Sequence, residues 1–154
     1  MMKKILIGVL FIAMIISGIP VMAQVNATTM EKSVINLVNV ERSKRKLPML
    51  KLNVKLGKTA RIKAEDMKNK NYFSHISPTY GSPFSMMTKF GISYTATGEN
   101  IAYGQRTPAA VMKAWMNSPG HRQNILNPAY TDIGVGFASK SNGVTYWVQQ
   151  FIRR

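Results

Sequence analysis

The sequence has 154 residues, no cysteine and a formal net charge of +15 at neutral pH. The absence of cysteine excludes a disulfide framework, a thiol nucleophile and a lipoprotein anchor, so the fold needs a full hydrophobic core. A chain of this length suits one domain.

The first residues have the pattern of an export signal. Lys3 and Lys4 precede an almost wholly apolar run over 5–19, and the segment that follows ends in Ala23, a small residue that suits a signal peptidase. The run is shorter than the roughly 20 residues that span a bilayer, which favours cleavage over a retained membrane anchor. We therefore predict a secreted protein, with a signal peptide over 1–23, a short segment over 24–29 and one domain over 30–154.

The excess of basic residues has to be reconciled with export. Nucleic acid is the usual partner of such a charge, but an exported protein does not meet it, and we expect no nucleic-acid partner. The basic residues are dispersed except at 42–46. We expect weak, salt-sensitive attraction to anionic envelope polymers. A secreted chain without disulfides suits a bacterium, and we expect a monomer.

Two long helices are predicted in the first half of the domain. Thr28 suits an N-cap and Glu31 would complete a capping box for a helix that ends near Lys44. A second helix should follow Asn53, because apolar residues recur at helical spacing as far as Met67 while lysines and arginines, Lys63 among them, occupy the other sides.

Two shorter helices and three strands complete the prediction. Ser82-Pro83 and Thr107-Pro108 each combine a cap with proline at the first helical position, and Ser118-Pro119-Gly120 should break the second of these helices. Asn142-Gly143 predicts a two-residue hairpin turn. Helices followed by strands indicate an α+β fold, in which helices cover an antiparallel sheet; the strands are expected over 99–103, 133–138 and 144–152.

The two histidines of the chain are the clearest candidates for chemistry. His75 and His121 each lie in a short polar segment that we expect to be a loop, and Glu99, one of six acidic residues, lies in a third. Imidazole and carboxylate groups bind metals and transfer protons near neutral pH. If the three segments meet in the fold, they form one site.

Five motifs follow one another along the chain: Asn39-Val40-Glu41-Arg42, 72–78, 98–102, 115–126 and 130–136. With the export signal, they resemble the CAP superfamily, the SCP-like family of cysteine-rich secretory proteins, allergens and plant pathogenesis-related proteins, and most closely its bacterial secreted branch. The resemblance implies a three-layer α-β-α sandwich with a central antiparallel sheet.

The same resemblance implies a cleft lined by two histidines and two acidic residues, which in some members hold a divalent metal such as zinc. By position the histidines are His75 and His121, and one acid is Glu99. The position of the second acid holds Ser118, as is common in bacterial relatives, so a site with four ligands is in doubt. Asn100 would help to orient the cleft.

The residues themselves leave two interpretations open. His75 and His121 could ligate zinc, with Glu99 as a third ligand and candidate catalytic residue, and a bound water would then become more acidic and could attack a carbonyl. Alternatively, the histidines hydrogen-bond to the backbone and to Glu99 and hold loops together. No HExxH-type motif is present.

We therefore expect an extracellular binding protein at the cell envelope rather than an enzyme, with a peptide, lipid or cell-wall component as its ligand and a divalent metal as an optional cofactor. The first alternative is a metal-dependent, peptidase-like hydrolase that acts on peptide or cell-wall material. The second is an adhesive module that works through its positive surface.

Overall fold

The computed structural model describes residues 21–154, with side chains from residue 28 onward. The predicted signal peptide therefore lies outside the described residues, except for 21–23, which are helical. Within the described part of the chain, none of the helices combines the length and the apolar character needed to cross a membrane.

Five helices and four strands make up this described part. In chain order they are α1 (Val21–Lys44), β1 (Lys51–Leu52), α2 (Val54–Lys70), α3 (Pro83–Lys89), β2 (Ala96–Tyr103), α4 (Pro108–Asn117), α5 (Pro119–Ile125), β3 (Asp132–Ser139) and β4 (Thr145–Arg153).

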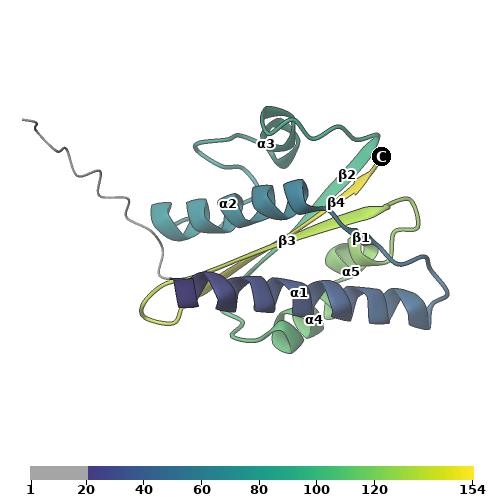
Figure 1. Ribbon diagram of the computed structural model, residues 1–154, viewed down its shortest axis with the longest axis horizontal. Helices are drawn as coiled ribbons and strands as arrows, with labels where there is room; N and C mark the ends of the chain where they lie inside the picture. Colours follow the sequence, from purple (N-terminus) through teal and green to yellow (C-terminus); the bar gives the residue numbers. More distant parts are fainter. Residues whose placement is uncertain (1–20) are drawn as a thin grey trace, which may run out of the picture.

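The elements form three layers around one mixed sheet. The strand order is β1-β3-β4-β2; β4 runs antiparallel to both of its neighbours, and the short β1 runs parallel to β3. Helices α2 and α3 lie on one side of the sheet, and α1, α4 and α5 lie on the other (Figure 1). The prediction of an α+β fold with an α-β-α sandwich is confirmed.

The alternation of side chains along the strands gives each face its own core. Trp115, Trp147 and Phe151 fill the layer toward α1 and α4, whereas Met67 and Val148 belong to the cluster toward α2. Two glycines of β3 allow α2 to approach closely, since a Cβ at Gly134 or Gly136 would lie 2.4 or 2.2 Å from the helix backbone. Substitution at either position would push α2 away from the sheet.

The start of the first helix differs from the prediction. Because α1 already begins at Val21, Thr28 is not its N-cap and Glu31 does not close a capping box. The buried Glu31 carboxylate instead accepts hydrogen bonds from Arg61 on α2 and from the Phe137 N–H on β3. Glu31 therefore ties three elements together and is not the local helix signal that the sequence pattern predicts.

Two connections were also predicted wrongly. Proline is tolerated in the first turn of a helix, so Ser118 ends α4 and at once begins α5, where a loop was expected. The β3–β4 hairpin closes between Lys140 and Val144. Gly143 has a φ of +84° whereas Asn142 has no positive φ, so the connection is a longer loop with a left-handed glycine instead of a two-residue turn.

Candidate functional site

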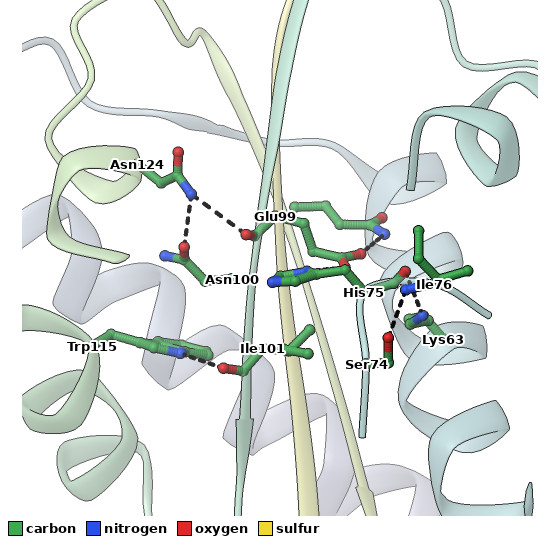
Figure 2. Close-up of polar contacts among 10 residues, drawn as sticks. Lys63, Ser74, His75, Ile76, Glu99, Asn100, Ile101, Trp115 and Asn124 are labelled. Atoms are coloured by element: carbon green, nitrogen blue, oxygen red, sulfur yellow. Dashed lines mark hydrogen bonds and ion pairs between the residues drawn. The ribbon is translucent and has the colours of Figure 1, made fainter. Parts of the chain in front are cut away.

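The site is built on β2, the edge strand of the sheet. Along β2, Glu99 and Ile101 face the α2 layer, and Asn100 and Ala102 face the layer of α4 and α5. Figure 2 shows the strand between these two groups of side chains, with Asn100, Asn124 and Trp115 on one side and His75 and Lys63 on the other. Residues 99–101 therefore contribute to both walls of one site.

Glu99 orients His75. Its side chain is 2% exposed, and its Oε1 lies 2.8 Å from Nδ1 of His75. Its Oε2 accepts a hydrogen bond of 2.9 Å from Nε2 of Gln150. Because a carboxylate accepts, Nδ1 of His75 faces Glu99 as the donor, which leaves Nε2 as the ring nitrogen directed away from Glu99. The His75 side chain is 48% exposed, so this imidazole meets solvent in a fixed orientation.

The loop that carries His75 is held by two charged residues of α2. Lys63 is 1% exposed, and its Nζ donates to the carbonyl of His75 at 2.8 Å. Burial lowers the pKa of Lys63, while the charges of Glu99 and Asp66 act in the opposite direction. The prediction that Lys63 lies on an open face of the helix is wrong. Lys63 lies three residues after Ala60 and four before Met67, a spacing that places it on the apolar face of the helix. Sequence reasoning missed this signal.

Asp66 is the second anchor of this loop. Its carboxylate accepts hydrogen bonds from Tyr72 (2.5 Å), Ser77 (2.7 Å) and Thr79 (3.0 Å). Burial alone would raise the pKa of Asp66, but these hydrogen bonds and Lys70 outweigh it and lower the pKa from 3.8 to about 2. Asp66 is therefore ionised at neutral pH and fixes the loop on both sides of His75.

The opposite wall is held by neutral amides. Nδ2 of the buried Asn100 donates to the carbonyl of His121 at 3.1 Å and to Oε1 of Gln149 at 2.9 Å. Asn124 on α5 donates to Oδ1 of Asn100 at 2.8 Å and to the carbonyl of Glu99 at 3.4 Å. These bonds attach α5 to β2, so the predicted orienting role of Asn100 has a concrete set of partners.

His121 lies in α5 and not in a loop, which corrects the prediction. Its side chain is half-buried. Burial, and to a smaller extent the positive charge of His75, lower the pKa of His121 below 6.5. His121 is therefore neutral at pH 7, with a ring nitrogen able to accept a hydrogen bond or to bind a metal.

A groove of about 390 Å³ adjoins this wall along the outer edge of β2. It is lined by Trp115 on α4, Ser118 between α4 and α5, and His121 on α5. Phe73 and Tyr103 also line it. The Ser118 hydroxyl makes no capping hydrogen bond to α5. Of the five predicted cleft residues, Ser118 and His121 line the groove itself, whereas His75, Glu99 and Asn100 lie beside it.

The side chains fit a metal only in part. No three histidine, cysteine, aspartate or glutamate residues within the described part of the chain are grouped so that they could hold a metal ion. Both Glu99 oxygens already accept hydrogen bonds from protein donors. Glu99 therefore suits the outer shell of a metal site, where a carboxylate orients a histidine ligand. His75 and His121 remain as two candidate imidazole ligands.

The family of the chain follows from its sequence. The model of the CAP family, described as the cysteine-rich secretory protein family, matches residues 35–151. The chain belongs to this family. The CAP domain here contains no cysteine at all, so its three layers are held together without disulfides.

Two Bacillus proteins are similar to this CAP chain. It is 59% identical over 122 residues to YkwD of Bacillus subtilis (strain 168), an alignment that covers 79% of this chain and 46% of YkwD. It is 33% identical to an extracellular protein containing an SCP domain from Bacillus anthracis str. Ames. The crystal structure of that protein matches with a TM-score of 0.82, over 89% of this chain and 44% of that protein. The chain thus spans less than half the length of both.

A more distant protein shares only the fold. An outer surface protein from Borrelia burgdorferi shares it with a TM-score of 0.74 at 24% identity, over 80% of this chain and 91% of that protein.

Proposed function

We propose that this CAP domain binds a ligand at the bacterial cell envelope through the cleft formed by His75, Glu99 and His121. The observation that supports this most is the orientation of His75, whose Nδ1 is held by the buried Glu99 while the ring itself stays half-exposed. A neutral His121 lies on the other wall. The oriented imidazole of His75 and the imidazole of His121, beside an open groove, can accept hydrogen bonds from a ligand or bind a metal that the ligand shares.

We also propose that the chain is exported. The basic start and apolar run at its N-terminus support export, and so does the similarity to a Bacillus anthracis protein that is described as extracellular. The net charge of +15 would bring the domain close to anionic envelope polymers.

The metal in this proposal is a divalent ion such as zinc, held by His75 and His121. Zinc in such a place would act as a Lewis acid toward an oxygen of the ligand. Other residues of the chain support His75, since Glu99 keeps its ring in position and Gln150 holds Glu99. With only two imidazole ligands from the protein, we expect weak metal binding compared with a closed site of four ligands.

The hydrolase alternative has less support. A general base needs a free oxygen near the water that it deprotonates. Both oxygens of Glu99 accept hydrogen bonds from protein donors, and Ser118 supplies no carboxylate in its place. We therefore place binding ahead of catalysis.

Retention on purified cell walls tests the proposal. We expect the double variant His75→Ala/His121→Ala to lose retention at physiological ionic strength. The exposed Lys113→Gln serves as a control for non-specific charge, and we expect only a small change from it. If the histidine variant is retained like wild type and raising the salt concentration releases both equally, the surface charge alone would account for binding, and the cleft proposal would be rejected.

Calorimetry with zinc tests the metal part separately. We expect heat of binding for wild type, no heat for His75→Ala, and an affinity about 10- to 100-fold weaker for Glu99→Gln, because the outer-shell carboxylate is lost. The absence of heat with wild type would reject metal binding and would leave the wall-binding experiment to decide the rest.

A further inference from the structure

The outer edge of β2 carries hydrogen-bonding groups that the fold leaves unused. The N–H of Gly104 donates to the carbonyl of Thr145 at 2.9 Å. Two residues earlier in the same ladder, Ala102 pairs with Trp147. In an antiparallel ladder the residues between such pairs direct their N–H and C=O away from the partner strand. Glu99, Ile101 and Tyr103 therefore point these groups outward.

Part of this edge is already capped. Nε1 of Trp115 donates to the carbonyl of Ile101 at 3.2 Å, and Asn124 donates to the carbonyl of Glu99. Among the residues with described side chains, none caps the N–H of Ile101 or either backbone group of Tyr103. The edge is blocked toward Glu99 and open at its Tyr103 end.

A buried acceptor lies beside this open end. Oε1 of Gln105 is inaccessible to solvent and has no hydrogen-bond partner among the described residues, although Gln105 lines the groove. A buried amide oxygen without a partner is costly. Because this oxygen is itself inaccessible, a ligand in the groove would meet two outward N–H groups, those of Ile101 and Tyr103, and one free acceptor, the Tyr103 carbonyl.

The walls of the groove suit the side chains of an extended ligand. Phe73 and Tyr103 are 50% and 49% exposed, and their ring centroids lie 5.9 Å apart. Tyr146 stacks edge-on behind Tyr103, and Lys140 lies over the Tyr146 ring. The open end therefore offers an aromatic surface with a positive charge nearby.

We infer that the groove binds an extended peptide segment, with acidic character at one end, that adds a short strand to the open edge of β2. A peptide presents a donor and an acceptor at alternate residues, which matches Tyr103 with both of its groups free. A ligand that offers only acceptors would leave the Tyr103 carbonyl without a partner. This inference rests on the proposed function, since it names the ligand class for the same cleft.

The peptide itself provides the first test. A blocked hexapeptide of alternating valine and threonine, extended by two glutamates, is titrated into the ¹⁵N-labelled protein. We expect chemical-shift changes at residues 101–105 and slower hydrogen exchange at the Tyr103 N–H. The same peptide with alternate N-methyl groups should bind about ten-fold more weakly, because it loses one or two hydrogen bonds. Equal binding of both peptides would overturn the inference.

A pair of protein variants provides the second test. Proline at 103 removes only an outward N–H and no ladder bond, so the sheet should remain intact. Tyr103→Ala is the matched control, because it removes the ring but keeps the N–H. We expect Tyr103→Pro to bind the peptide several-fold more weakly than Tyr103→Ala does. Equal affinities would contradict strand addition; if Tyr103→Pro fails to fold, the N-methylated peptide alone decides.

The result can be separated from the proposed function by measuring wall retention on the same preparations. Retention that depends on the histidines, without any response to the peptide, would overturn strand addition and leave the cleft proposal standing. If retention does not depend on the histidines either, the cleft proposal falls as well. An edge that is hydrated only would show no slowing of exchange at Tyr103, which also overturns the inference.

Discussion

The two walls that flank β2 use different chemistry to hold a histidine in place. The His75 loop is fixed by acidic and basic side chains, Asp66 and Lys63 on α2 and Glu99 on the strand. The α5 wall is fixed by neutral amides, through Asn100 and Asn124. The first wall should therefore respond to acid and to single charge changes, whereas the second should respond to the loss of hydrogen-bonding groups and little to pH.

Removal of Asp66 should break the charged wall most severely. Asp66→Ala leaves three hydroxyl donors and the Lys70 ammonium without their acceptor. We expect a loss of about 4 kcal/mol in the free energy of unfolding, measured by urea denaturation, because uncompensated buried polar groups are costly. The neighbouring Glu65→Ala, which removes a partly exposed pair with Lys68, should cost less than about 1 kcal/mol. Similar losses would contradict the anchoring role.

Removal of Asn100 should break the neutral wall. Asn100→Ala removes the hydrogen bonds that Asn100 makes with the carbonyl of His121, with Oε1 of Gln149 and with Nδ2 of Asn124. We expect about 2 to 3 kcal/mol of destabilisation, together with faster amide hydrogen exchange in α5. Asn117→Ala, at an exposed position of α4, is the control. Faster exchange in the His75 loop instead of α5 would show that the two walls are not separate.

Acid should weaken the charged wall selectively. The pKa of Asp66 is lowered from 3.8 to about 2 in the folded chain. The unfolded state thus takes up its proton first, and the stabilisation is present above pH 3.8 and disappears as the pH falls through 2. We expect Asp66 to account for a loss of about 2 kcal/mol over this range. Denaturation of wild type and Asp66→Asn at several pH values measures it; parallel curves would contradict the assignment.

The sequence predicted the elements that local patterns encode. Helix α2 follows Asn53 and Ser82 caps α3 as expected, and the strands around 99–103, 133–138 and 144–152 are present with slightly different ends. The errors at Glu31 and Ser118 share one cause. In both places a local signal was interpreted without the distant partner or the next helix that determines the role of the residue.

For the candidate site, the family motifs identified the principal residues but not their supports. His75, Glu99 and His121 could be named from the sequence, whereas Gln150 could not, because the pairing of β2 with β4 determines that it reaches Glu99. Asp66 carries no local motif, and its partners lie six to thirteen residues further along the chain. Only the Ala60–Lys63–Met67 spacing on α2 offered a signal that could have been used.

The smallest effect that we predict concerns His121 and distinguishes the walls near neutral pH. Its pKa is lowered below 6.5, first by burial and then by the charge of His75. When the pH falls below 6.5, His121 therefore binds a proton in the unfolded state before it does so in the folded state. The folded state should lose stability there, and the loss should continue until the pH passes the lowered pKa. His121→Gln should show a flatter pH dependence between pH 7 and 5 in denaturation experiments with a chelator present. Asp66→Asn should keep the wild-type slope in that range, because Asp66 stays ionised in both states. If His121→Gln and wild type show equal slopes, the α5 wall does not desolvate this histidine. The contrast would then fail between a charged wall that responds below pH 4 and a neutral wall that responds only through its imidazole.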